Sequence, residues 1–289
     1  MRQVAVILAF FLAVQFLGLY IGAVLELNRS EFAAFNVAVA PEGGIAPPLL
    51  FLVAVVAGAA FLVILFHFYK GLLLFKLMEA FIILVASNIV FYVILLSLGI
   101  PFYYALAFLL SLGVALAKFF SPRFKNLAAI LASAGVGAVF GFSLDLLPAV
   151  IFVVGLSLYD VLAVFFTRHM VVMAQELGRR NLAFSVSAEQ KVKVKLPRRK
   201  APVEQRSVLE LGTGDLSIPC MLAVSAFKYG NALSLWHGAA YALASIGGSS
   251  LALVLVLYAV LRGRLFLPAL PPLAFGGLAG IALARLLYA

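Results

Sequence analysis

Leu211-Gly212-Thr213-Gly214-Asp215 places an acidic residue inside an apolar stretch that runs from Ser207 to Phe227. A second acid, Asp160, follows Tyr159 inside another apolar stretch, Leu147 to Phe166. A carboxylate near the centre of a bilayer costs at least about 2.5–3.5 kcal/mol, so an acid kept at such a position indicates a function. These two acids are therefore the first candidates for a functional pair.

The composition around them is that of a membrane protein. The chain has 289 residues, of which 65% are hydrophobic and 11% are charged, whereas soluble domains are about 45–50% apolar and about 25% charged. The net charge of +10 lies mainly in the expected loops, which favours contact with anionic lipid and argues against a nucleic-acid partner. The single cysteine, Cys220, excludes a disulfide within the chain.

Stretches of about 20 mostly apolar residues predict nine membrane-spanning helices. They are Val4–Leu25, Pro48–Phe66, Leu72–Ser97, Phe102–Ala117, Leu127–Leu144, Leu147–Phe166, Ser207–Phe227, Leu233–Leu261 and Leu265–Leu287. The fold class is therefore expected to be all-α and polytopic. A basic loop (168–206) separates an N-terminal six-helix part (1–167) from a C-terminal three-helix part (207–289).

The distribution of Lys and Arg predicts the orientation. With the N-terminus inside, 18 of these residues fall on the inner side and three on the outer side; without the long basic loop the ratio is eight to three. Because positive loops stay in the cytoplasm, we expect the N-terminus and the 168–206 loop to be cytoplasmic and the C-terminus to lie outside the cell membrane.

The two acids are expected at matching depth. The sixth predicted helix runs inward and ends about six residues after Asp160, and the seventh runs outward from Ser207, with Asp215 eight residues in. At 1.5 Å per residue both acids lie roughly 9–12 Å from the inner helix ends. Two carboxyls about 3 Å apart cannot easily both ionise. One can then act as a base on water while the other protonates a peptide amide.

The residues near Asp215 fit a site that needs access. Gly212 and Gly214 leave its approach free of side chains, and Pro219 cannot donate a hydrogen bond to the Asp215 carbonyl. The ninth predicted helix begins at Leu267-Pro268-Ala269-Leu270-Pro271-Pro272, where the prolines leave carbonyls unpaired near the inner surface. Taken alone, the Gly and Pro residues near Asp215 would also fit a kinked transporter helix. Taken alone, the prolines of the ninth helix would also fit an ordinary helix start.

Together, three motifs resemble those of a known family. Tyr159-Asp160, Gly212-Thr213-Gly214-Asp215 and Pro268-Ala269-Leu270 lie in this order on the sixth, seventh and ninth expected helices. This arrangement resembles the presenilin and signal peptide peptidase family, the GxGD intramembrane aspartyl proteases, in the form of its compact microbial members. The resemblance implies that Asp160 and Asp215 are catalytic. It also implies that the other motif residues shape the site or help to hold substrate: Tyr159, Gly212, Thr213, Gly214, Pro268, Ala269 and Leu270.

The expected function is that of an intramembrane aspartyl endopeptidase. Its partners would be the transmembrane segments that it cleaves, together with membrane lipid. The mechanism requires no cofactor and no metal, and the sequence offers no cluster of metal ligands. The alternative is a proton-coupled transporter with Asp160 and Asp215 as its relay, although an odd helix count without inverted repeats weighs against it. A membrane chaperone that binds helices would need neither acid.

Other charged residues have simpler interpretations. Glu79 follows Lys76 by three residues, so a local ion pair is expected. Glu210 is expected in the first turn of the seventh helix, where an acid suits the helix dipole. Asp145 precedes Pro148, so we expect it to cap the sixth helix.

The basic loop contains a strict alternation, Lys191-Val192-Lys193-Val194-Lys195-Leu196. One interpretation is a solvated segment attracted to anionic lipid. The other is an edge strand that pairs with unwound substrate, which resembles the way presenilins hold theirs.

Overall fold

The computed structural model describes residues 2–30, 32, 53, 57–58, 72–162, 185–194, 203–263 and 268–288. These residues form eight α-helices: α1 (Arg2–Leu27), α3 (Leu72–Ser97), α4 (Tyr103–Phe120), α5 (Lys125–Ser143), α6 (Leu146–Leu162), α8 (Thr213–Asn231), α9 (Leu235–Gly263) and α10 (Leu270–Tyr288). Six helical segments are long and apolar enough to cross a membrane, and α6 is a shorter apolar helix. The predicted count of nine helices is not confirmed, and the expected helix Pro48–Phe66 lies almost wholly outside the described residues.

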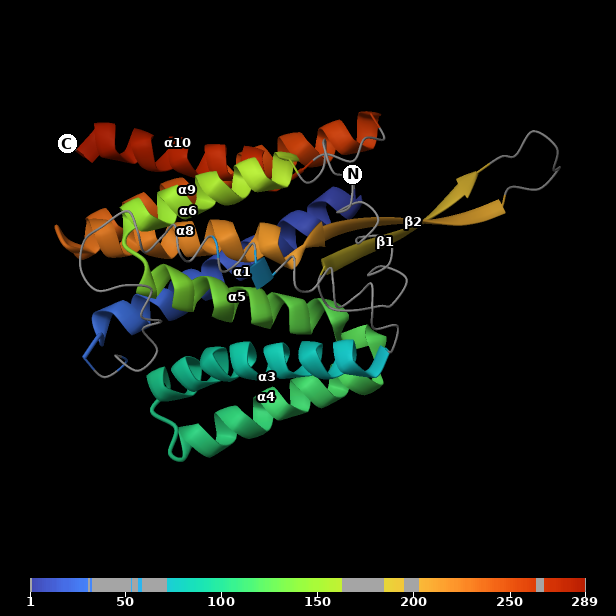
Figure 1. The fold of residues 1–289 in the computed structure, drawn as a ribbon, viewed down its shortest axis with the longest axis horizontal. Coiled ribbons are helices and arrows are strands. Elements are labelled where there is room, and N and C mark those ends of the chain that lie inside the picture. Colours follow the sequence, from blue (N-terminus) through green and yellow to red (C-terminus); the bar gives the residue numbers. More distant parts are fainter. Residues whose placement is uncertain are drawn as a thin grey trace.

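The helices lie side by side in a bundle, and a two-stranded hairpin projects from one end (Figure 1). Helix α8 lies in the middle of this bundle, where it packs against α1, α5, α6, α9 and α10. The N-terminus lies at the hairpin end and the C-terminus at the opposite end. The expected orientation of the two termini relative to the membrane stays a prediction.

Small residues bring α8 close to α5. A Cβ atom added at Gly137 would lie 2.9 Å from the Ser217 carbonyl oxygen, so the two helix backbones approach each other closely there. One turn further along, a Cβ atom added at Gly141 would collide with the side chain of Val224. Such contacts replace the hydrophobic driving force that helices lack in lipid. The same principle holds α9 against α10.

The hairpin corrects the all-α prediction. Strands β1 (Ser185–Val194) and β2 (Val203–Gly212) pair in antiparallel fashion. The seventh helix therefore begins at Thr213 and not at Ser207. The reason is a period of two: Leu209 and Leu211 are buried whereas Val208 and Glu210 are exposed. Since only one side of a strand faces the core, this alternation is typical of a half-buried strand.

Side chains of the bundle anchor the hairpin through its β1 strand. Asn126 at the start of α5 donates to the Ser187 carbonyl and accepts from the Ser187 amide, both at 2.9 Å. Gln3 of α1 donates to the Ala188 carbonyl at 3.0 Å. On the other strand, Lys125 lies 3.2 Å from the Glu210 carboxylate. Glu210 thus belongs to a strand and an ion pair, and the prediction that it lies in a helix is wrong.

The register shows which strand edge is open. Because Asn126 bonds both backbone groups of Ser187, those groups point away from β2. Ser187 pairs with Glu210, so the backbone groups of Glu210 point away from β1 as well. The same holds for every second residue, including Val208 and Gly212. In the part of the chain that the structure describes, the sheet has only these two strands, and the outer edge of β2 leads directly to the start of α8.

Candidate active site

The two predicted acids meet at the hairpin end of the bundle. Asp160 lies near the end of α6 and is 7% exposed, while Asp215 lies in the first turn of α8. Helices α6 and α8 are in contact, and the charge of Asp160 acts on Asp215. The structure therefore places the two acids on helices that are in contact, near enough for the charge of one to act on the other. However, Asp215 lies three residues into its helix, because the strand continues to Gly212.

The glycines determine how Asp215 is held. Gly212 is the N-cap residue of α8 and offers no side chain for capping. Its backbone amide instead donates to the Asp215 carboxylate, an arrangement like half of a capping box. A Cβ atom at Gly212 would lie 3.2 Å from the Asp215 Oδ2 atom, whereas one at Gly214 would meet nothing within 4 Å. Gly212 allows the carboxylate to fold back, and Gly214 leaves its surroundings open.

The third motif reaches the other acid through its backbone. Pro268 and Ala269 precede α10, and Leu270 begins it. The Leu270 amide donates to the Asp160 carboxylate. Sequence reasoning placed this motif near the site but proposed unpaired carbonyls as its contribution. The prolines that follow Leu270 suit the first turn of a helix, where amides lack partners in any case.

Tyr159 and Thr213 are motif residues close to the two acids in the chain. Tyr159 is partly buried beside Asp160. The carbonyl of Thr213 lies 3.5 Å from the Ser133 hydroxyl of α5. A further contact was not foreseen: Gln15 of α1, which is fully buried, donates to the carbonyl of Leu216 at 2.9 Å. A glutamine in the middle of the first predicted helix was the only sequence signal for it.

Glu79 has a different partner from the one expected. Glu79 forms an ion pair with Lys118 of α4, and not with Lys76 of its own helix as expected. Lys76 lies over the Phe119 ring at 5.9 Å. Among the described residues, no group of three or more His, Cys, Asp or Glu side chains could hold a metal ion.

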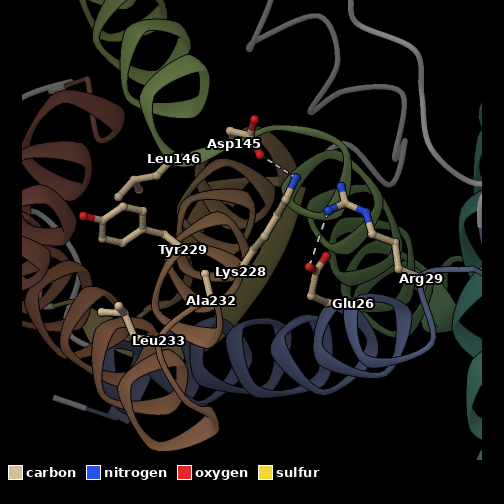
Figure 2. Close-up of a pocket in the computed structure, with 8 residues that line it drawn as sticks. All are labelled: Glu26, Arg29, Asp145, Leu146, Lys228, Tyr229, Ala232 and Leu233. Atoms are coloured by element: carbon tan, nitrogen blue, oxygen red, sulfur yellow. Dashed lines mark ion pairs between the residues drawn. The ribbon is translucent and has the colours of Figure 1, made fainter. Parts of the chain in front are cut away.

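A cavity at the other end of α8 lies far from the two acids. It has a volume of about 370 Å³ and is lined by Glu26, Arg29, Asp145, Leu146, Lys228, Tyr229, Ala232 and Leu233 (Figure 2). Lys228 bonds Asp145 at 2.7 Å, and Arg29 lies 3.5 Å from Glu26. Lys228 follows Asp215 by 13 residues of the same helix, which separates them by about 20 Å. The Lys228–Asp145 pair joins the ends of α6 and α8 that lie away from the hairpin, whereas the Arg29–Glu26 pair is local to the end of α1.

Fold and site thus define a helical membrane protein with paired carboxyls at one end of its bundle. The chain matches the family model "Signal-peptide peptidase, presenilin aspartyl protease" over residues 8–289. It therefore belongs to this family, and its enzyme class is that of an intramembrane aspartic endopeptidase. The family resemblance seen in the three motifs is confirmed.

Two solved structures share the fold. Both are described as a presenilin family intramembrane aspartate protease, one in a C222 and one in a P2 crystal form. The first has a TM-score of 0.70 at 23% identity, covering 98% of this chain and 99% of its own. The second has a TM-score of 0.66 at 24% identity, covering 97% and 96%. No curated protein matches the sequence.

Proposed function

We propose that Asp160 and Asp215 are the catalytic pair with which this protein hydrolyses peptide bonds inside membrane-spanning segments. The observation that carries this proposal is their meeting where α6 contacts α8, within a chain of the aspartyl protease family. The transporter alternative finds no support in the comparisons.

The chemistry needs no other group. One carboxylate takes a proton from a water molecule as the water oxygen attacks the peptide carbonyl carbon. The other carboxyl, protonated, stabilises the developing oxyanion and gives its proton to the departing amine. Each carboxylate also accepts one hydrogen bond from a backbone amide: Asp215 from Gly212 and Asp160 from Leu270. These fixed donors hold the two groups in place, which is the pre-organisation that such a mechanism requires.

The substrate must unwind before it is cut, because the amides of a transmembrane helix are hydrogen-bonded and shielded. The free edge of β2 can receive the unwound segment as a third strand. Outward-pointing backbone groups at Val208 and Glu210 lead along this edge toward Asp215. The edge of β1 is less suitable, since Asn126 already occupies both backbone groups of Ser187. Pro268, Ala269 and Leu270 would border the same segment beside Asp160.

The proposed test uses purified protein in detergent with a spanning peptide as substrate. Asp160→Asn and Asp215→Asn should each abolish cleavage while the thermal transition is kept, because each acid has a separate role. Removing a buried charge can even raise the melting temperature. An aspartyl-protease transition-state mimic should stop the wild-type reaction. Activity above a few per cent in both variants would refute the assignment, and proton-coupled uptake in liposomes would favour the transporter.

A further inference from the structure

An ion pair that the proposed reaction does not use lies inside the bundle. Glu79 of α3 and Lys118 of α4 are bonded to each other, and their side chains are 4% and 6% exposed. The cost of removing two charges from water often exceeds their mutual attraction. Charged residues within membrane helices therefore indicate a function.

Glu79 also lines a small cavity behind the catalytic turn. This Glu79 cavity has a volume of about 120 Å³ and lies between α3, α5 and α8. Its lining residues are Glu79, Ile82, Ile83, Ala132, Ser133, Val136, Thr213 and Ser217. Thr213 and Ser217 are four residues apart and so share one face of α8, while Asp215 lies between them on another face. The cavity therefore borders the back of the turn that carries Asp215.

The chemistry of the Glu79 cavity suits water. At about 30 Å³ per molecule its volume corresponds to roughly four waters, and a polar lining is the condition for keeping them. Glu79, Ser133, Thr213 and Ser217 are the polar residues of the lining, beside four apolar ones. A carboxylate near a helix N-terminus is attracted by the dipole of that helix.

We propose that Glu79 is a positioning residue that holds the first turn of α8 through water in the Glu79 cavity, with Lys118 as its ion-pair partner. This inference rests on the proposed function, since it takes Asp215 to be catalytic. Glu79 lies on α3 and would act on Asp215 only through this turn. It restrains the turn from which the Asp215 carboxylate acts.

The test removes both charges at once, so that neither is left unpaired. Glu79→Met combined with Lys118→Met should give a protein that melts at or above the wild-type temperature, because apolar replacement of a buried pair is often neutral or stabilising. Its kcat should fall at least about ten-fold with KM within about two-fold, since a misplaced catalytic group affects the chemical step. Binding of the transition-state mimic should weaken in parallel. Wild-type kcat at wild-type stability would overturn the inference.

A matched control is the ion pair at the far end of α8. Asp145→Ala combined with Lys228→Met removes a pair that also joins helices but lies about 20 Å from Asp215. Its kcat should stay at the wild-type value; an equal loss there would show a general packing effect and overturn the inference.

A second variant covers the case in which the double replacement does not fold. Ser217→Leu fills the Glu79 cavity and leaves the ion pair intact. It should lower kcat with the melting temperature unchanged, and an unchanged kcat would overturn the inference. Asp215→Asn in the same assay separates the two proposals. If it is inactive while the cavity variants are fully active, only the positioning role fails. If it is active, the proposed function fails.

Discussion

At the scale of single residues, the two acids of the site could be predicted from the sequence, whereas several of their contacts could not. Asp160 and Asp215 were found because acids are rare in apolar stretches. The hydrogen bond from Leu270 to Asp160 was not, because it joins a backbone amide to a carboxylate 110 residues away. No residue pattern encodes the direction of that amide. The Glu79–Lys118 pair was missed for a related reason, since its partner lies on a neighbouring helix rather than one turn away.

The pH dependence of cleavage follows from the roles of the two acids. One carboxyl must be ionised and the other protonated, so the rate should rise and then fall as pH increases. The two inflections belong to the pair and not to either residue. Initial rates measured across pH with stability followed in parallel provide the check. A rate that climbs steadily into alkaline conditions would indicate a hydroxide or serine-type reaction instead.

Gln15 should position the residue that follows Asp215. Its amide nitrogen bonds the Leu216 carbonyl, while its Oε1 atom has no partner among the described residues. Gln15→Met should therefore reduce kcat about ten-fold, equivalent to about 1.4 kcal/mol of barrier. The melting temperature should stay or rise, because an unpaired buried acceptor is removed.

Ser225→Ala is the matched control for Gln15. Ser225 is also fully buried on α8 and bonds the Gly141 carbonyl at 3.2 Å, but it lies ten residues beyond Asp215. Loss of that bond should leave kcat unchanged. A similar loss of kcat in both variants would assign the Gln15 effect to packing.

At the scale of elements, helices were predicted more reliably than strands. The helix expected at Leu72–Ser97 is found with the same bounds, because every backbone group in lipid must be satisfied within the segment and apolar length therefore defines a helix. Strand β2 was instead merged with the apolar run that follows it. Its partner strand lies across a loop, and pairing between distant segments leaves no mark on local apolar length. Only the alternation at Lys191–Leu196 indicated a strand; residues 191–194 belong to β1, and Lys195 and Leu196 lie outside the described residues.

The two strand edges can be tested separately. Val208 and Glu189 face each other in the register, and each directs its amide outward, along opposite edges of the sheet. Val208→Pro removes an outward donor from β2, and proline is tolerated at such edge positions. It should impair turnover of a spanning substrate. Glu189→Pro removes the corresponding donor from β1 and should leave turnover unchanged. The reverse result would place the substrate on β1, and two unaffected variants would favour a role of the hairpin in lipid contact.

At the scale of the whole molecule, the sides of the bundle differ. The N-terminus, the hairpin and the acid pair share one end, and the C-terminus lies at the other (Figure 1). Because Lys and Arg are expected in excess on the hairpin side, we propose that this end faces the cytoplasm. The site would then cut its substrates near their cytoplasmic ends.

This orientation predicts which substrates are cleaved. A peptide must meet the two acids with its chain direction fixed relative to them, since the strand added to β2 has only one productive direction. Inverting the enzyme in the membrane therefore inverts the substrate that it accepts. With its N-terminus in the cytoplasm, the present protein should prefer segments whose N-terminus is outside and whose C-terminus is cytoplasmic. Glycine near the cut should help, because it weakens the helix that must unwind.

The experiment places one spanning sequence in both orientations, by exchange of its flanking charges and fusion partners, in the same membrane as the enzyme. Cleavage products are then compared at equal expression, with Asp215→Asn as the inactive control. The N-outside form should be cut faster. Preferential cleavage of the N-inside form would refute the proposed orientation and leave the protease itself untouched. Because the acids, the hairpin and the N-terminus share one end of the bundle, that result would place all three on the outer side together.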